Sequence, residues 1–104
     1  MDNNLISRSF KTFQEAAPGI SGPWAEFIMK SAKANALDKK TAELVYLAVL
    51  AAIRLDSGIP FHVKMAREAG ATREEIISAI LTGLPAAGHA VINALPAALD
   101  AYDN

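Results

Sequence analysis

A glutamate and a histidine are the two side chains of this sequence best suited to acid–base chemistry. Glu43 lies near the start of a strongly apolar segment, and His62 lies in the segment that follows it. A carboxylate that binds an imidazole fixes its tautomer and makes its free ring nitrogen more basic, which is a common proton-transfer unit. Each residue alone also has a structural interpretation, Glu43 as a first-turn acid beside Lys39 or Lys40 and His62 as a hydrogen-bonded core residue. The catalytic hypothesis therefore requires the two side chains to meet.

Three further side chains are candidates for holding a substrate. Arg54 lies eleven residues after Glu43, so on one helix it shares nearly the same azimuth about 16 Å further along the axis. Arg54 is a candidate for binding a substrate carboxylate near the loop that follows; the equal alternative is a solvated side chain or a bridge to Asp56. Ser57 lines the same loop, although turn chemistry alone explains a serine there. His89 is the only other histidine. With Glu43 and His62 it would complete a two-His-one-carboxylate metal site, but the spacing matches no known metal signature and no metal is expected.

The elements that must position these residues are helices, because apolar residues recur every three or four positions along the chain. We expect helices over residues 5–16, from Ser21-Gly22-Pro23 to about 34, 39 to about 54, from a cap at Ser57 through 69, 73 to about 82, and 85–102 with a break at Pro96. Asp38 is the expected N-cap of the third helix. Thr72 and Glu75 form a capping box for the fifth. The predicted fold is a compact all-α domain of five to seven helices.

Composition predicts an assembly rather than a monomer. The 104 residues are 52% hydrophobic and 20% charged, and a chain this short has few interior positions in which to bury apolar side chains. The third helix is apolar almost all the way round, which is typical of the centre of a bundle or an assembly. One domain that forms a homo-oligomer is therefore expected.

Charge and residue usage exclude several classes of partner. The net charge is −1, with acids and bases interspersed, so the chain lacks the basic surface that nucleic-acid binding requires. The longest apolar run, Leu44–Ile53, is far shorter than the roughly 20 residues of a membrane span. The N-terminus has no signal-peptide pattern and the chain has no cysteine. We therefore expect a cytoplasmic protein without disulfides, membrane contact or nucleic-acid partner.

An ordered set of short motifs resembles the carboxymuconolactone decarboxylase family, which includes the alkyl hydroperoxidase D-like proteins. The motifs are Leu37-Asp38-Lys39-Lys40 with Glu43-Leu44, then His62 with Ala66, then Gly70-Ala71-Thr72-Arg73-Glu74-Glu75-Ile76, and a looser match runs through Gly88 to the alanine-rich end. The resemblance implies an all-α domain that assembles into trimers or hexamers, with its site near a subunit interface.

For the peroxidase branch, the resemblance implies a relay in which Glu43 matches the glutamate and His62 the downstream histidine. The two cysteine positions of that branch fall on Leu55 and Gly58, and the histidine between them falls on Ser57. A peroxidase of this type needs a thiolate nucleophile and a resolving thiol. Leucine and glycine supply neither, so thiol-based peroxide reduction is excluded for this chain.

The decarboxylase branch needs no cysteine, because acid–base residues suffice for a small lactone carboxylate. One hypothesis is therefore a thiol-free lyase or isomerase that acts on a small organic acid, with Glu43 and His62 as the proton-transfer pair and Arg54 as the anion holder. Such a mechanism calls for no cofactor. The other hypothesis is a non-catalytic oligomer of the same family that binds a small apolar acid or a partner, in which Glu43 and His62 form a structural pair.

Overall fold

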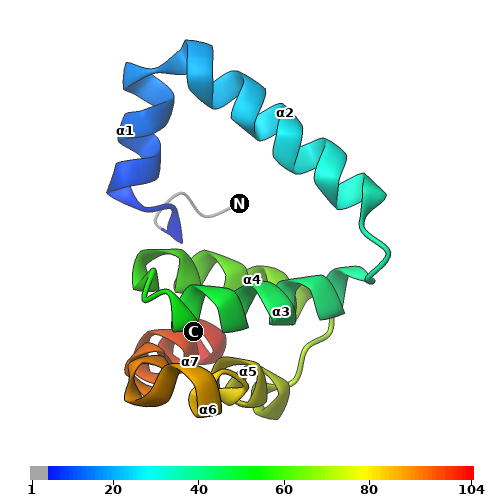
Figure 1. The fold of residues 1–104 in the computed structure, drawn as a ribbon, viewed down its shortest axis with the longest axis vertical. Coiled ribbons are helices and arrows are strands. Elements are labelled where there is room, and N and C mark those ends of the chain that lie inside the picture. The colour runs from blue at the N-terminus through cyan, green and yellow to red at the C-terminus, as the bar shows by residue number, and fades with distance from the viewer. Residues whose placement is uncertain (1–4) are drawn as a thin grey trace. The chain divides into compact units, whose positions relative to one another are not determined.

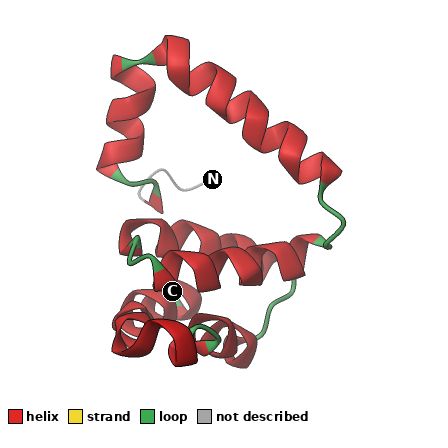
Figure 2. Cartoon of the chain, viewed as in Figure 1, coloured by secondary structure: helices red, strands yellow, loops and turns green. Residues whose placement is uncertain are grey.

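The computed structural model describes residues 5–104, and the chain divides into two compact units, Met1–Leu37 and Asp38–Asn104. Every regular element among the described residues is a helix and none is a strand (Figures 1 and 2). The expected all-α class is confirmed. The expectation of a single domain stays a prediction.

The first unit is a pair of helices, α1 (Arg8–Ala16) and α2 (Pro18–Ala34). Ser7 caps α1 by accepting a hydrogen bond from the Phe10 amide at 3.1 Å. The indole of Trp24 contacts the rings of Phe10 and Phe13 edge-on, with centroids 5.7 and 5.8 Å apart. None of the described side chains of these two helices is buried.

The start of α2 corrects the sequence prediction. We expected the helix to open at Ser21-Gly22-Pro23, but it begins at Pro18, in the first-turn position where proline is well tolerated. The amide of Ser21 already donates to the carbonyl of Ala17 at 2.9 Å, so the helix is formed before Ser21 is reached. Pro23 consequently lies inside the helix rather than at its beginning.

The second unit contains the core. Its elements are α3 (Lys39–Ala52), η2 (Asp56–Gly58), α4 (Ile59–Glu68), α5 (Arg73–Leu81), α6 (Leu84–Ala87), η3 (Gly88–Ala94) and α7 (Leu95–Asp103). Helix α3 packs against α4 and α5, and α7 packs against the same two helices. The buried side chains are aliphatic, and many are alanines that let the helices approach closely: Leu47, Leu50, Ala51, Ile59, Val63, Ala66, Ala71, Ile76, Ile80, Val91, Ala94, Ala98 and Ala101.

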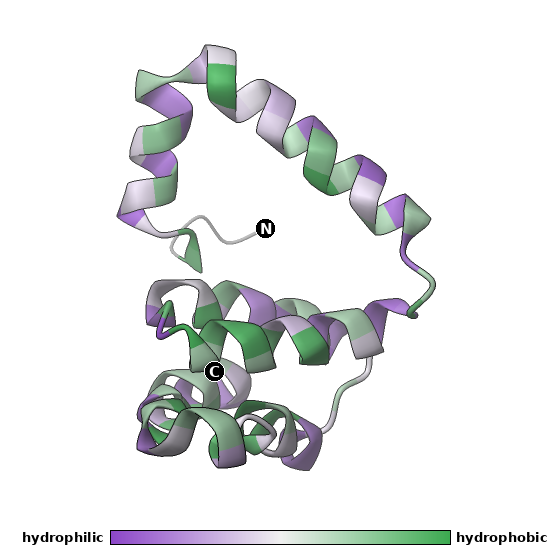
Figure 3. Cartoon of the chain, viewed as in Figure 1, coloured by the Kyte–Doolittle hydropathy of each residue, from purple (hydrophilic) through white to green (hydrophobic). Residues whose placement is uncertain are grey.

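Helix α3 packs into the core along one side, and its other side is exposed. The side chain of Asp38 caps it by accepting from the Thr41 amide at 2.8 Å, as expected. Its buried stripe is Leu47, Leu50 and Ala51. The opposite side leaves large apolar residues roughly half exposed: Val45 49%, Tyr46 44%, Val49 47% and Ile53 63%. Much of the α3 ribbon has the hydrophobic colour in Figure 3.

The connection from α3 to α4 differs from the expectation in one respect. We predicted that Ser57 would cap α4, but Ser57 lies within η2 and the N-cap is Gly58, which makes no side-chain cap hydrogen bond. The short 3₁₀ turn brings the chain into α4 directly, with Pro60 in the first turn. Proline lacks an amide hydrogen and has a helix-compatible φ, so one donor fewer needs a cap.

The end of the chain folds as separate short elements. Residues Arg73–Asp103 are apolar and long enough to cross a membrane by length and composition alone. In the fold they are broken into α5, α6, η3 and α7, and α7 begins with Pro96 in its first turn, where the break was expected. Because α5 and α7 pack against α3 and α4, this stretch is consistent with the core of a soluble protein. A cytoplasmic location stays a prediction.

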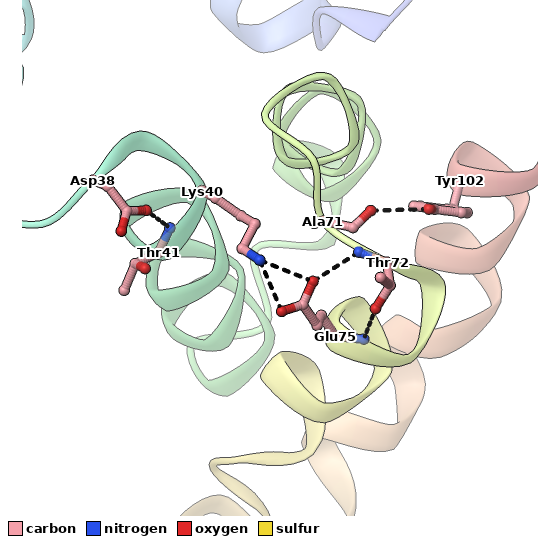
Figure 4. Close-up of polar contacts among 7 residues, drawn as sticks. All are labelled: Asp38, Lys40, Thr41, Ala71, Thr72, Glu75 and Tyr102. Carbon is pink, nitrogen blue, oxygen red and sulfur yellow. Dashed lines mark hydrogen bonds and ion pairs between the residues drawn. The ribbon is translucent and has the colours of Figure 1, made fainter.

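A polar network ties the beginning of α3 to that of α5 (Figure 4). Thr72 Oγ1 accepts from the Glu75 amide at 3.1 Å, and the Glu75 carboxylate accepts from the Thr72 amide at 2.9 Å, which confirms the predicted capping box. The same carboxylate binds Lys40 Nζ at 3.0 and 3.3 Å. Tyr102 of α7 donates to the carbonyl of Ala71 at 2.9 Å, so three helices are held around the start of α5.

This network predicts a pH-dependent contribution to stability. The hydrogen bond from the Thr72 amide, and after it the bond from Lys40, lower the pKa of Glu75 below its ordinary value. The ionised Glu75 carboxylate therefore stabilises the folded state above its unfolded-state pKa, and this contribution is lost as pH falls through the lowered folded-state pKa. Glu75→Gln should reduce the free energy of unfolding at pH 7 and flatten its decline in acid. Urea unfolding from pH 7 to pH 3 measures this, with Glu74→Gln as the neighbouring control.

Candidate functional site

Glu43 of α3 and His62 of α4 meet. Glu43 Oε2 lies 2.9 Å from His62 Nδ1. With an ionised carboxylate and a neutral imidazole, Nδ1 must donate to Glu43, which leaves Nε2 as the ring nitrogen with a free lone pair. The His62 and Glu43 side chains are 26% and 16% exposed. The pair is thus shielded from bulk water but not sealed inside the core.

Two aromatic rings flank the imidazole, and sequence reasoning missed both. The Tyr46 ring centroid lies 4.4 Å from that of His62 with the planes inclined by 59°. Phe61 is 5.1 Å away at 81°, in an edge-to-face arrangement. The signal for Tyr46 was its spacing of three residues from Glu43, which places both side chains on one face of a helix.

Arg54 occupies a strained backbone position at the end of α3. Its φ is 63°, in the left-handed region that costs an ordinary residue about 1–2 kcal/mol. The Leu55 amide donates to the Leu50 carbonyl at 2.9 Å and the Arg54 amide to the Ala51 carbonyl at 3.3 Å. This is the Schellman termination, in which glycine is the usual residue. The Arg54 side chain is exposed.

Two substitutions at Arg54 separate the energetic cost of its left-handed backbone from the contribution of its side chain to stability. Arg54→Gly should raise the free energy of unfolding by about 1 kcal/mol because glycine adopts the left-handed region without penalty. Arg54→Ala keeps the strained φ and removes the side chain beyond Cβ, which is exposed, so it should leave stability nearly unchanged. Chemical denaturation of the three proteins gives both differences. Equal stability of the glycine and alanine variants would show that position 54 is not strained in solution.

The other two candidate residues, Ser57 and His89, are not hydrogen-bonded to the Glu43–His62 pair among the described residues. Ser57 is exposed in η2, and His89 is exposed in η3. Neither side chain forms a hydrogen bond to Glu43 or His62 in the part of the chain that the structure describes. Over residues 5–104 there is no group of three His, Asp or Glu side chains that could hold a metal ion, so the two-His-one-carboxylate arrangement is not formed there.

A surface groove lies beside the Glu43–His62 pair rather than around it. A shallow groove of about 450 Å³ runs between α3 and α5, lined by Leu44, Val45, Ala48, Glu74, Glu75, Ser78, Ala79 and Thr82. Glu43 and His62 are not among its lining residues. The pair therefore lies at a partly open surface of this chain, next to the exposed apolar side of α3.

Comparison with known proteins identifies the family. Residues 18–101 match the model of the carboxymuconolactone decarboxylase family. The chain belongs to this family. A solved apo structure of a carboxymuconolactone decarboxylase family protein from Legionella pneumophila has the same fold, with a TM-score of 0.77 and 26% identity over 91% of this chain and 85% of that one. No curated protein matches the chain significantly.

This carboxymuconolactone decarboxylase family protein has no thiol with which to do chemistry. Its 104 residues include no cysteine, so the groups available for chemistry are carboxylates, imidazoles, hydroxyls and amino or guanidinium cations. Among these groups, Glu43 and His62 are held by a hydrogen bond in a geometry that suits acid–base catalysis.

Proposed function

We propose that this carboxymuconolactone decarboxylase family protein is a thiol-free lyase or isomerase acting on a small organic acid, with Glu43 and His62 as its proton-transfer pair. The observation that carries the proposal is the 2.9 Å hydrogen bond from His62 Nδ1 to Glu43 Oε2. It orients the imidazole and directs its basicity to Nε2, as an oriented general base requires.

The proposed proton transfers balance without a cofactor. In an isomerisation, Nε2 takes a proton from the carbon next to a carbonyl group, and Glu43 stabilises the imidazolium that forms. Nε2 then returns the same proton to another carbon of the delocalised anion. In a decarboxylation, the carboxylate leaves as CO₂ and the electron pair of the broken carbon–carbon bond stays on the substrate. An initially protonated His62 delivers a proton to that carbon and regains one from water before the next turnover. Glu43 remains ionised in both reactions.

Arg54 and Ser57 are proposed to hold the acid group of the substrate, and His89 is a further candidate for this role. The guanidinium is always charged and forms bidentate hydrogen bonds with a carboxylate. Its occurrence at φ 63°, where glycine would be more stable, supports a role for the side chain itself. The expected ligand is a small mono- or dicarboxylic acid, a lactone carboxylate or a β-keto acid.

A second candidate is a non-catalytic member of the family that binds a small apolar acid or a partner. The observation that favours it is the replacement of the two thiol positions by Leu55 and Gly58. In this case Glu43 and His62 are a partly buried structural pair. Replacing them together by Gln and Asn would then change thermal stability without abolishing any activity.

A panel of small lactone carboxylates and β-keto acids tests the proposal directly. The wild-type protein is incubated with each compound, and turnover is followed by ultraviolet absorbance and by release of CO₂. The proposal predicts turnover of at least one compound in the wild type and its loss in His62→Gln. Turnover that is equal in the wild type and the variant would remove His62 from the mechanism.

The proposed functional form is a homo-oligomer, a trimer or hexamer. Val45, Val49 and Ile53 expose 49%, 47% and 63% of their surface along one side of α3, which is a large apolar area for a monomer to leave in water. Burial of this side against a second copy would remove that apolar area from water.

Disrupting that apolar side should disrupt the assembly. Ile53→Lys is expected to shift the mass from a multiple of 11.0 kDa toward the single-chain value, because burial of a lysine without a partner is costly. Light scattering after size-exclusion chromatography measures the mass. Gln14→Lys adds the same charge at another exposed position and should leave it unchanged. A wild-type monomer would contradict the proposal at once.

A further inference from the structure

We infer that Tyr46 is a positioning residue of the Glu43–His62 pair: its ring holds the imidazole so that Nδ1 stays on the carboxylate. The inference rests on the proposed function, since it concerns the same pair. It extends that function by assigning a third residue to the site.

One hydrogen bond does not fix an imidazole. The bond from Nδ1 to Glu43 Oε2 at 2.9 Å defines one point of the ring, and the ring can still rotate about its side-chain torsions. The Tyr46 ring, whose centroid lies 4.4 Å from that of the imidazole, supplies a second contact. Aromatic pairs at this separation have a preferred geometry and add stabilisation beyond the area they bury. Together the two contacts restrict both the position and the inclination of the His62 ring.

Tyr46 acts on the pair rather than on the core. Its side chain is 44% exposed and it is not part of the buried aliphatic cluster of this unit. It lies one turn after Glu43 on α3, so this helix carries the carboxylate that bonds to the imidazole and one of the two rings that flank it. The other ring, Phe61, precedes His62 on α4. His62 itself comes from α4. The relative position of the two α3 side chains is therefore set by helix geometry, and the half-exposed Tyr46 ring lies against the histidine.

Solvent exchange of the His62 Nδ1 proton tests this assignment, because a proton held between a fixed imidazole and a carboxylate exchanges slowly enough to be followed by NMR. Tyr46→Phe keeps the ring and should leave the exchange rate unchanged. Tyr46→Leu removes the ring, and exchange should become about 2- to 10-fold faster, the range that corresponds to the strength of an aromatic pair. Because Tyr46 is half exposed, the leucine variant is expected to fold, which its circular dichroism spectrum checks.

The outcomes separate this inference from the proposed function. Equal exchange in Tyr46→Leu and the wild type overturns the role of Tyr46 while the pair remains. Faster exchange in both Tyr46→Leu and Tyr46→Phe overturns the assignment to the ring, because the hydroxyl would then be responsible. A wild-type signal that is absent, or that is unaffected by Glu43→Leu, overturns the pair itself and the inference with it. Faster exchange in Tyr46→Leu alone supports the assignment.

Discussion

Replacing Glu43 by glutamine slows turnover of any lactone or β-keto acid that this protein accepts by about 10²- to 10⁴-fold, the range that a positioned acid–base group contributes. Glutamine has nearly the same shape, and its amide oxygen still accepts from His62 Nδ1, bonded at 2.9 Å in the wild type. What is lost is the negative charge that stabilises the imidazolium. The expected decrease lies in kcat rather than in KM, since the carboxylate contacts His62 and not the substrate.

Steady-state kinetics of matched variants measure this loss. His62→Gln removes the base itself and should lower kcat at least as much as Glu43→Gln. The double variant should be little worse than His62→Gln, because residues that act as one unit are not additive. Glu74→Gln removes an exposed acid and serves as the control. Independent, additive losses in the double variant would contradict a coupled pair.

Leu47→Ala lowers the free energy of unfolding by about 2–5 kcal/mol, the usual cost of truncating a fully buried leucine. Leu47 has no exposed surface and lies in the middle of α3, where it packs in the core with Leu50 and Ile80. The loss is a large share of the roughly 5–15 kcal/mol that stabilises an ordinary domain. Because the cluster consists of short aliphatic side chains and alanines, few atoms are available to fill the cavity.

Chemical denaturation with Val45→Ala as the control tests this expectation. Val45 lies two residues earlier on the same helix but is 49% exposed, so its truncation should cost much less. In the proposed oligomer, a surface used for assembly would also contribute to stability, and that contribution would depend on protein concentration. Both variants are therefore compared at two protein concentrations. A loss for Val45→Ala that equals that for Leu47→Ala at both concentrations would mean that the buried and exposed sides of α3 are assigned wrongly.

Local chemistry made parts of this fold predictable. The caps at Asp38 and at Thr72 with Glu75 depend on side chains three residues apart, and they occur as expected. The prediction for the start of α2 was wrong because two prolines, Pro18 and Pro23, each satisfy first-turn rules, and residue type alone does not decide between them. The prediction for Ser57 failed for a similar reason, since a 3₁₀ turn replaces the side-chain cap.

The site was predictable only in part. The types and spacing of Glu43 and His62 suggested a pair, but whether they meet depends on how α3 crosses α4, which no local pattern fixes. The contact between Tyr46 and His62 depends on the same crossing and was not foreseen. The left-handed backbone of Arg54 was also missed, because glycine is the residue by which such a position is normally recognised.

The most direct measurement of the central claim is the tautomer of neutral His62, read from the ¹⁵N chemical shifts of its ring, with exposed His89 as the internal reference. Neutral wild-type His62 should carry its proton on Nδ1 and leave Nε2 bare, and Glu43→Leu should abolish this preference while His89 does not change. A wild-type His62 that carries its proton on Nε2 would show that the ionised carboxylate is not bound to Nδ1, and the proposed Glu43–His62 pair would be wrong.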